Sequence, residues 1–511
     1  MFDGGKICGV VAARDAKSML KQLDRALLRT RTVELRLDWL ANDAEITRFL
    51  RRLAARTPRA TMIATCRRRE AGGLYRGSIA KQLVLLAEAL RAGCAWYDLD
   101  IETASKCPKE PVDVLLGSGK QLASAHFFHG MPKSLNRVAA KLRKSRPDAI
   151  KIASECKSLA DAVKLLRVAH GKRSVTAVPM GDAVPPARIL ALQQGSALAY
   201  APVENTTAPG QFSLEDMVDL YRADRLDRRT RTYGVIGNPV GHSLSPQLQN
   251  AGFQARRINA VYLPFLVRDL GDFLAAIKPL GIAGFSVTLP HKEAMLRRLD
   301  GCDPLARAIG AVNTVVVRPG GKLYGYNTDY VGILRSLEHR IQLSSSRVLV
   351  VGAGGVARAV AFALVQAEAA VCISSRRKKP AQTLAKMAGA VALPPDRIKH
   401  EFFDAIVNAT PVGMYPFVTD SPLDAAELNC RLVFDTIYRP RVTKLMQLAA
   451  RRGIECISGV EMFVAQGTAQ WEIWTGERAP VQTMRRAVER ALACEETVNA
   501  HTGDRIQQAP R

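Results

Sequence analysis

The stretch RVLVVGAGG, residues 347–355, decides how the second half of the chain folds. Its β-branched residues predict a buried strand, and the glycines after it predict a tight turn that opens a helix. Backbone N–H groups and the helix dipole at such a turn suit a pyrophosphate. The spacing GxGGxA is a variant of the dinucleotide-binding fingerprint and needs support from the surrounding sequence. The candidate contacts of this turn are Gly352, Ala353, Gly354 and Gly355.

The next predicted strand, VCISSRRKK at residues 371–379, indicates which nucleotide the turn binds. Sites selective for NAD place an acidic residue at the end of this strand to bind the ribose hydroxyls. Here Ser375, Arg376, Arg377 and Lys379 occupy that end, and their hydroxyl and cationic groups suit a 2′-phosphate. The sequence therefore predicts an NADP site.

The segment upstream, residues 233–335, alternates predicted strands and helices and carries several polar motifs. GNPVGHSLSPQLQN, residues 237–250, has two serines two residues apart. If that stretch is extended, both hydroxyls face one side and bind one anionic group, although a plain helix cap is the simpler alternative. A lysine–aspartate pair further on predicts proton delivery to a carbonyl oxygen. The candidate residues are Ser243, Ser245, Thr288, Lys292, Asn313 and Asp329.

The first half of the chain repeats a shorter β–α unit. Eight such units within about two hundred residues predict a small (β/α)8 TIM barrel, because an open doubly wound sheet would have fewer strands and a glycine-rich first turn. The predicted strands are residues 7–13, 32–38, 61–66, 95–101, 121–126, 149–154, 174–180 and 197–203.

Polar residues at the carboxyl ends of barrel strands meet at the active site of such a barrel. Lys151 stands among apolar residues in AIKIAS, so we expect a desolvated amine of lowered pKa that forms an imine with a ketone. His126, one strand away, is placed to move a proton beside that imine. Taken alone, each has a structural alternative: a snorkelling lysine and a structural histidine. The remaining candidates are Glu34, Arg36, Arg67, Arg188, Thr207 and Gln211.

Length and charge narrow the class of protein. A chain of 511 residues favours two or three domains, and its formal net charge is +26. The basic residues lie in helical stretches without interleaved aromatics, which favours solvated helix faces and a field attractive to small anions over nucleic-acid binding. The ten cysteines form no CxxC pair and indicate reduced thiols. We found neither a signal pattern nor a membrane-length apolar run, and expect a cytoplasmic protein without a metal.

The motifs of the first half resemble those of type I 3-dehydroquinate dehydratases. VELRLD, TCRRREAGG, SAHFFHGMP, DAIKIAS, GSALAY and TTAPGQ occur in that order within residues 6–220. The resemblance implies that Lys151 forms a Schiff base with the C3 carbonyl of 3-dehydroquinate. It further implies that His126 removes the C2 proton and assists loss of the C1 hydroxyl, while the other candidates hold substrate. Phe127 and Ala71 depart from the family pattern, which has Asp or Asn and an acid there.

The second half resembles shikimate dehydrogenases over residues 233–490. GNPVGHSLSP, VTLPHK, GAVNT, YNTD, GAGG, NATPVGM, FDTIYRP and GVEMFVAQ all occur in order. The resemblance implies that Lys292 and Asp329 are the catalytic pair. It implies shikimate contacts from the candidate residues above together with Gln466. It implies NADP(H) contacts from Gly352 to Gly355, Ser375, Arg376, Thr410, Met414 and Gly459. Ser375 and Pro380 replace an asparagine and a basic residue of the family.

The resemblances together imply a bifunctional enzyme of the shikimate pathway. We expect a barrel at residues 1–222, a linker at 223–232, a shikimate-binding domain at 233–335, a Rossmann NADP domain at 336–459, helices 460–495 packing back, and a disordered tail at 496–511. Two alternatives stay open: a quinate dehydrogenase that favours NAD, and a regulatory protein built from degenerate copies. Arg376 argues against the first, and the complete set Lys151, His126, Lys292 and Asp329 argues against the second.

Overall fold

The computed structural model describes residues 2–56, 58–107, 116–117, 119–172, 174–204 and 210–506. The chain divides into two compact units. The first comprises Met1–Thr232 with Asn259–Gly281, and the second comprises Tyr233–Ile258 with Ile282–Arg511. No helix within the described ranges is long and apolar enough to cross a bilayer.

The first unit is built around an eight-stranded parallel sheet in the order β7-β6-β5-β4-β3-β2-β1-β8. The end strands also approach each other, since the N–H of Ala197 donates to the carbonyl of Val175 at 2.9 Å and makes the sheet a nearly closed barrel. The strands are β1 Ile7–Val11, β2 Thr32–Arg36, β3 Thr61–Thr65, β4 Trp96–Asp100, β5 Lys120–Phe127, β6 Ala149–Glu155, β7 Val175–Met180 and β8 Ala199–Pro202.

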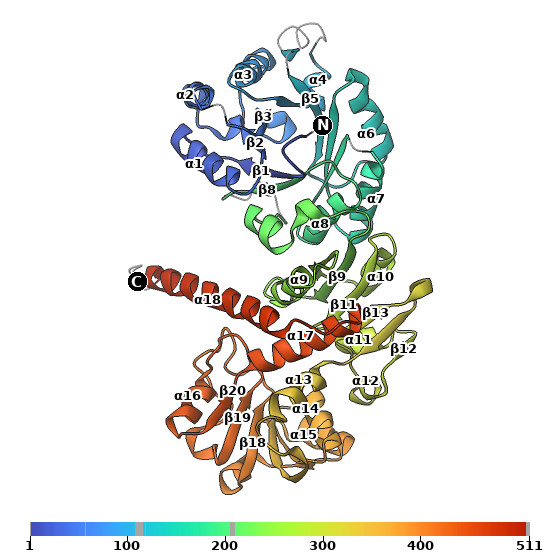
Figure 1. Cartoon of the computed structure of the whole chain (residues 1–511), viewed down its shortest axis with the longest axis vertical. Coiled ribbons are helices and arrows are strands. Elements are labelled where there is room, and N and C mark those ends of the chain that lie inside the picture. The colour runs from blue at the N-terminus through green and yellow to red at the C-terminus, as the bar shows by residue number, and fades with distance from the viewer. Residues whose placement is uncertain are drawn as a thin grey trace. The chain divides into compact units, whose positions relative to one another are not determined.

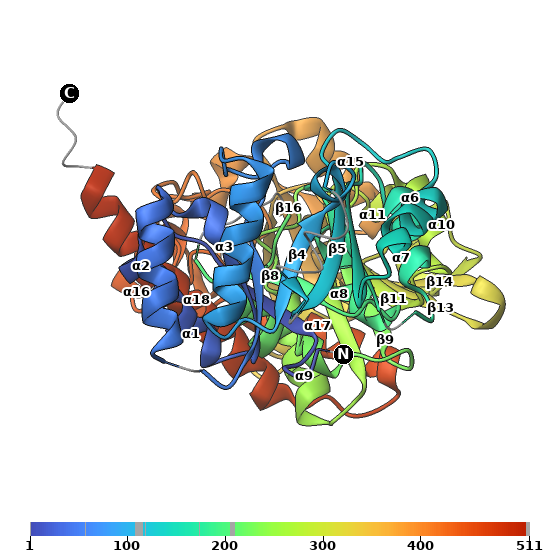
Figure 2. The same ribbon diagram turned by 90° about the horizontal axis from the view of Figure 1, so that it is seen from above.

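Helices surround these strands, with α1, α2 and α3 on one flank and α6 and α7 on the other (Figures 1 and 2). Several begin at a Ser, Asp or Asn side chain that accepts a backbone N–H of the first turn, as Asp15 does for α1 and Ser158 for α7. The helices are α1 Ala16–Leu27, α2 Asp43–Ala54, α3 Ile79–Arg91, α4 Ile101–Ala104, α6 Leu135–Leu142, α7 Leu159–Ala169 and α8 Pro185–Gln193.

Apolar side chains fill the barrel interior below the site. Trp96 of β4 stacks on Phe2 at 4.2 Å between ring centroids, and Ala149 of β6 belongs to the same core cluster. Because side chains two apart in a strand face the same side, Lys151 occupies the layer next to Ala149. The strand period thus directs the lysine into the barrel.

The segment 259–281 of the first unit contains β10 (Ala260–Leu266) and α10 (Leu270–Ile277). Helix α10 packs against α7. Asp272 of α10 accepts the backbone N–H groups of Leu159 and Ala160 at 2.8 and 3.1 Å, so it satisfies free donors at the start of α7.

The second unit contains two sheets. In the first, β9 (Arg231–Gly237), β11 (Ile282–Val287), β13 (Thr314–Val317), β14 (Leu323–Tyr326) and β12 (Gly301–Cys302) are neighbours in that order. The pairs β11–β13 and β13–β14 are antiparallel. The associated helices are α9 Ser245–Ala255, α11 Lys292–Leu296, α12 Pro304–Ile309 and α13 Asp329–Leu337.

The other sheet is parallel throughout, with the order β17-β16-β15-β18-β19-β20. Helices α14 and α15 pack on one face and α16 on the other, and each face has its own apolar core (Figure 1). The elements are β15 Arg347–Val351, α14 Gly355–Gln366, β16 Ala370–Ser374, α15 Lys378–Ala388, β17 Val391–Ala392, β18 Phe403–Asn408, β19 Cys430–Asp435, α16 Lys444–Arg451 and β20 Glu455–Ile457. The predicted fold class, a TIM barrel followed by a two-lobed α/β unit with a Rossmann-like sheet, is confirmed.

Two helices complete the second unit. Helix α17 (Gly459–Thr475) packs against α13 and against β11 and β13, and α18 (Val481–Ile506) packs against α9 and α17. The tail that the sequence predicts to be disordered from residue 496 overlaps the end of α18, and residues 507–511 lie outside the described ranges. The predicted linker, residues 223–232, holds a short 3-10 turn, Ala223–Arg225, and the first residues of β9.

A buried carboxylate ties together the loops at the end of the parallel sheet. Asp435, 0% exposed, accepts hydrogen bonds from the Thr443 hydroxyl at 2.6 Å, the Asn408 amide at 3.0 Å and the Ile437 N–H at 3.1 Å. Burial raises its pKa to about 6, although the hydrogen bonds act in the opposite direction. The folded state therefore binds a proton that the unfolded chain releases at lower pH.

This raised pKa predicts a specific pH dependence of stability. Below the pKa of Asp435 in the unfolded chain, the carboxyl is protonated in both states and its burial costs little. As the pH rises towards about 6, the unfolded chain releases this proton while the folded lobe keeps it, so the free energy of unfolding falls by about 3 kcal/mol. Asp435→Asn removes the charge, keeps the shape and leaves one oxygen to accept from Asn408 and Ile437, while its NH2 group would donate to the Thr443 hydroxyl. We expect its stability advantage over the natural chain to grow between about pH 4 and pH 6, measured by thermal unfolding.

The exposed Asp420 on the same lobe provides the control. Asp420→Asn changes the net charge by the same amount. The difference in thermal stability between this variant and the natural chain should stay constant with pH. Parallel pH profiles for Asp435→Asn and the natural chain would contradict the interpretation.

Candidate functional site

Lys151 lies at the centre of a buried charge cluster in the barrel. Its side chain is 4% exposed, and Nζ lies 2.7 Å from Oδ2 of Asp98 and 3.1 Å from Oε1 of Glu34. The same nitrogen sits 4.4 Å above the centre of the Tyr200 ring, a cation–π distance. The apolar surroundings expected from AIKIAS are therefore wrong: strands β2 and β4 direct carboxylates at the amine.

Asp98 connects the lysine to the neighbouring strand ends. It also contacts Arg67 at 3.1 Å and accepts the Ser124 hydroxyl at 2.5 Å. Burial alone would favour its neutral form, but the charges of Lys151 and Arg67 hold the pKa of Asp98 well below its usual range. Glu34 in turn accepts the Thr65 hydroxyl at 2.9 Å. The carboxylates are thus fixed by groups on three strands.

Arg36 is buried in the same region but is committed to another partner. Its guanidinium forms a bidentate pair with Asp38, at 3.0 Å from Nε to Oδ1 and 2.8 Å between the terminal nitrogen and Oδ2. Asp38 also accepts the N–H of Leu74 at 3.2 Å. Arg36 therefore borders the charge cluster and, through Asp38, also helps to hold the loop at Leu74 after β3.

His126 borders the cluster from β5. Partial burial and the charges of Arg67 and Lys151 hold its pKa well below the ordinary value for histidine, so the ring is neutral near pH 7. Its Nδ1 has no hydrogen-bond partner among the described residues. The ring of Phe128 lies nearly parallel, 6.0 Å away and at 16°. A neutral imidazole beside an amine suits proton transfer.

The other predicted barrel residues are less closely connected to Lys151. Arg188 is buried on α8, and burial lowers its pKa to about 10. Gln211 is partly buried in the segment after β8, and Thr207 lies outside the described residues. The structure therefore brings together Glu34, Arg67, His126 and Lys151, and it adds Asp98. That Arg188, Thr207 and Gln211 bind substrate stays a prediction.

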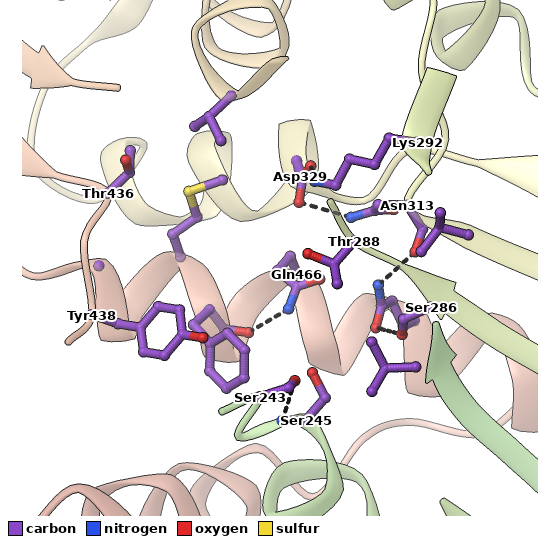
Figure 3. A pocket seen from close by; sticks show the side chains of 17 residues that line it. Ser243, Ser245, Ser286, Thr288, Lys292, Asn313, Asp329, Thr436, Tyr438 and Gln466 are labelled. Atoms are coloured by element: carbon purple, nitrogen blue, oxygen red, sulfur yellow. Dashed lines mark hydrogen bonds and ion pairs between the residues drawn. The ribbon is translucent and has the colours of Figure 1, made fainter. Parts of the chain in front are cut away.

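The second candidate site is a cleft in the dehydrogenase-like unit, shown in Figure 3. Nζ of Lys292 lies 2.6 Å from Oδ2 of Asp329, and the side-chain amide of Asn313 donates to the other oxygen at 2.8 Å. Lys292 begins α11 and Asp329 begins α13, so two helix starts bring the pair together. One carboxylate thus orients the ammonium and is itself held by an amide.

The two predicted serines line the same cleft, but their backbone is a turn and not an extended strand. The N–H of Ser243 donates to the carbonyl of Val240 at 3.1 Å, and Ser245 is the first residue of α9. The Ser243 hydroxyl accepts the N–H of Ser245 at 3.2 Å, which is a local capping contact. Figure 3 shows both side chains at one end of the cleft. The helix-cap alternative is therefore observed, and the binding of an anionic group by these two hydroxyls stays a prediction.

Helix α17 contributes two glutamines to the cleft, and the sequence predicted only one. Gln466 donates to the carbonyl of Phe463 at 3.0 Å, and Thr288 after β11 lies in the same lining. Gln470 accepts the hydroxyl of Ser286 at 2.7 Å and donates to the carbonyl of Asn313 at 3.3 Å. The i, i+4 spacing of Gln466 and Gln470 on a helix was the available signal.

The glycine turn after β15 has room for a phosphate group. A Cβ added to Gly354 or Gly355 would meet no heavy atom within 4 Å, whereas at Gly352 it would lie 2.8 Å from the carbonyl oxygen of Ala409. Gly352 also has φ of 125°, which disfavours other residues. Helix α14 begins at Gly355 without a side-chain cap, so its N–H groups face the open space. These features fit a dinucleotide pyrophosphate.

The remaining predicted cofactor residues follow neighbouring strands of the same sheet. Ser375 and Arg376 follow β16, and the Ser375 hydroxyl donates to the carbonyl of Arg377 at 2.7 Å. Thr410 follows β18, and its hydroxyl donates to Asn408 at 2.7 Å. Met414, 43% exposed, lies further along that loop, and Gly459 begins α17. The carboxyl ends of parallel strands lie at one edge of a sheet, where such cofactors bind.

Comparison with known protein families follows the same division of the chain. Residues 7–228 match the model of type I 3-dehydroquinase. Residues 235–315 match the shikimate dehydrogenase substrate binding domain, residues 335–435 the shikimate/quinate 5-dehydrogenase model, and residues 459–489 the shikimate 5′-dehydrogenase C-terminal domain.

One relative spans both halves. The chloroplastic bifunctional 3-dehydroquinate dehydratase/shikimate dehydrogenase of Arabidopsis thaliana is 34% identical over 499 residues, which cover 93% of this chain and 82% of the relative. The chain belongs to this bifunctional family. Its second half is also similar to the shikimate dehydrogenase (NADP(+)) of Bacillus cereus, at 41% identity over 272 residues, which cover 51% of this chain and 98% of the relative.

Solved shikimate dehydrogenases resemble the same half of this bifunctional chain. One from Thermus thermophilus, in complex with NADP(H) and shikimate, is 35% identical with a TM-score of 0.48 and covers 52% of this chain and 100% of its own. Another, in complex with NADP+, is 35% identical with a TM-score of 0.49 and covers 52% of this chain and 96% of its own.

Ala71 and Phe127 depart from the dehydratase pattern: Phe127 directly follows His126 in the sequence, and Ala71 lies in the turn after β3. Glu70 pairs with Arg68 at 2.9 Å and is 57% exposed, so it does not replace the acid missing at Ala71. Ala71 is buried, and Phe127 ends β5. A Cβ on the adjacent Gly72 would lie 2.1 Å from the ring of Phe128. An aromatic ring packed on glycine therefore borders His126 in this bifunctional chain.

The low pKa of His126 predicts a shift in the pH profile of the dehydratase reaction. Arg67→Met removes a cation that disfavours the imidazolium, so the pKa of His126 should rise. The acid limb of log kcat/KM against pH should then move to higher pH, in addition to a general loss of rate. Steady-state kinetics from pH 4.5 to 9 measure the shift.

Arg68→Met is the matched control, because Arg68 pairs with the exposed Glu70 and has the same charge. It should leave the acid limb in place. An unshifted limb in Arg67→Met would show that His126 does not control this ionisation.

Proposed function

We propose that the barrel dehydrates 3-dehydroquinate to 3-dehydroshikimate and that the cleft of the second unit reduces this product to shikimate. The observation that carries the proposal is the contrast between two lysines. Lys151 is enclosed with two carboxylates and a neutral imidazole, whereas Lys292 lines an open cleft as one half of an ion pair. Both families represented in the chain support these two activities.

In the barrel, the Lys151 ammonium gives one proton to the neutral His126, and the free amine attacks the C3 carbonyl. The hydroxyl of this adduct takes the proton back and leaves as water, which gives a cationic imine. Asp98 and Glu34 stabilise positive charge at this nitrogen in both the ammonium and the iminium, because each lies within 3.1 Å of it. His126 takes the C2 proton, and the C1 hydroxyl leaves as water after receiving a proton. Hydrolysis of the imine then releases the product and regenerates Lys151.

The barrel site offers cationic and neutral polar side chains to the carboxylate and hydroxyls of the substrate. We assign the binding of these groups to Arg67, Arg188 and Gln211, helped by Thr207 and Arg36. Arg67 and Arg188 are only 7% and 4% exposed, so a carboxylate that reaches them is desolvated and bound strongly. The net charge of +26 also favours the approach of anions.

In the cleft, Lys292 donates a proton to the carbonyl oxygen of the substrate, and Asp329 orients the ammonium. Ser243 and Ser245 bind the substrate carboxylate, while Thr288, Asn313 and Gln466 bind its hydroxyls. NADPH, when bound, supplies the hydride. The glycine turn, Gly352 to Gly355, would hold the pyrophosphate of this cofactor. Ser375 and Arg376 would bind its 2′-phosphate. The other parts of the cofactor would contact Thr410, Met414 and Gly459. Reduction then needs only one proton from the protein.

The order of reactions explains the joining of the two halves. Dehydration yields the ketone that the second site reduces, so one chain carries two successive steps. We assign residues 1–222 to the dehydratase, residues 233–335 with helices 460–495 to shikimate binding, and residues 336–459 to NADP binding. We also propose a cytoplasmic location, supported by ten free cysteines, whereas the Arabidopsis relative is chloroplastic.

Separate inactivation of the two lysines tests the proposed function. Lys151→Met should lower dehydration at least ~1000-fold and leave shikimate oxidation intact, because only one site loses its nucleophile. Lys292→Met should lower only the NADP-linked reaction, by at least ~100-fold. The absorbance of 3-dehydroshikimate and that of NADPH measure the two activities on the same preparations. Loss of both activities in either variant would contradict independent sites.

The basic end of β16 predicts the nucleotide preference. Arg376→Ala should weaken NADP about 10–100-fold while NAD changes little, since a charge-assisted hydrogen bond to a phosphate is lost. Steady-state kinetics with both nucleotides, and with shikimate and quinate, measure this. Lys386→Ala, on the last turn of α15, is a control of equal charge. Faster turnover of quinate with NAD in the natural chain would favour a quinate dehydrogenase instead.

A further inference from the structure

Arg439 lies beside the cleft but belongs to neither set of predicted site residues. It follows β19 and is adjacent in sequence to Tyr438, which lines the cleft (Figure 3). The Tyr438 ring stacks on Phe463 of α17 at 4.7 Å and 27°. The Arg439 side chain is only 20% exposed. Its position is therefore fixed by the wall of the cleft, and its charge is largely withdrawn from solvent.

The guanidinium of Arg439 joins two segments that are far apart in sequence. One terminal nitrogen donates to the backbone carbonyl of His242 at 3.0 Å. The other contacts Glu495 of α18 at 2.5 Å. The acceptor carbonyl belongs to the residue immediately before Ser243. The arginine thus holds the backbone of the turn that presents both serine hydroxyls to the cleft.

Helix α18 completes a closed chain of contacts. It packs against α9, the helix that begins at Ser245, and its Glu495 fixes the arginine that holds His242. A second ion pair on α18, the bidentate contact between Arg485 and Glu461 at 2.7 Å for both bonds, lies elsewhere on the helix. The serine turn is therefore supported from its helix side by α18 and from its loop side by Arg439.

We propose that Arg439 is a positioning residue that sets the affinity of the cleft for the carboxylated substrate by fixing the serine turn, with Glu495 fixing the arginine. The inference rests on the proposed reduction at this cleft. Among the described residues, the guanidinium contacts His242 and Glu495. Lys292 pairs with Asp329, which also accepts from Asn313. Loss of the contact should therefore loosen ground-state binding and leave proton transfer intact.

The test is a steady-state comparison of Arg439→Ala with the natural chain in the full-length protein. We expect KM for shikimate to rise about tenfold, the effect of losing one hydrogen bond from a charged donor. The kcat should stay within about threefold and KM for NADP within about twofold. Arg439→Lys should recover part of the loss, and Glu495→Gln should raise KM less than Arg439→Ala does. Dehydratase activity on the same preparations should be unchanged.

Arg485→Ala is the matched control, because it removes the same charge and an ion pair of the same helix without touching the serine turn. It should leave KM for shikimate within about twofold. The proposal is overturned if Arg439→Ala leaves this KM unchanged, if it lowers kcat alone, or if Arg485→Ala raises KM equally. Absence of shikimate-dependent NADPH formation in the natural chain would instead refute the proposed reduction.

Discussion

The ion cluster of Lys151, Asp98 and Glu34 is the interaction on which the barrel site depends. Burying a lone charge costs several kcal/mol, so each member requires the others. The cluster exists because strands β2, β4 and β6 place inward-facing side chains at one level of the barrel. The Ser124 hydroxyl donates to the second oxygen of Asp98. Thr65 and Arg67 share with Lys151 the oxygens Glu34 Oε1 and Asp98 Oδ2. Removal of one charge would leave its partner buried and unpaired, which makes the arrangement sensitive to single substitutions.

The two lysines of the bifunctional chain are prepared for different chemistry. Lys151 is enclosed by charge on several sides, which suits a nitrogen that remains cationic while it is covalently bound to substrate. Lys292 has one carboxylate partner at the start of a helix and opens into a cleft, which suits delivery of a proton. In the proposed mechanism, the first site stabilises a cation bound to substrate, and the second site orients a proton donor beside a separately bound cofactor.

The sequence predicted the elements that have a strong local signal. Strand period and glycine spacing indicated the barrel and the parallel sheet, and the paired motifs located Lys151, His126, Lys292 and Asp329. It did not predict Asp98, because an aspartate in AWYDLDI gives no sign of facing a lysine two strands away. The Arg439 contacts with His242 and Glu495 were also missed, since they depend on packing between distant segments. The turn at Ser243 is local, and the sequence indicated it only as the helix-cap alternative.

Reductive trapping with borohydride in the presence of 3-dehydroquinate tests the central claim most directly. The adduct should map by mass spectrometry to the peptide that contains Lys151. In Asp98→Asn, which keeps the shape but loses one carboxylate charge, the trapped fraction should fall at least about tenfold because the iminium loses a stabilising partner. An adduct on another lysine, or equal trapping in Asp98→Asn, would contradict the account.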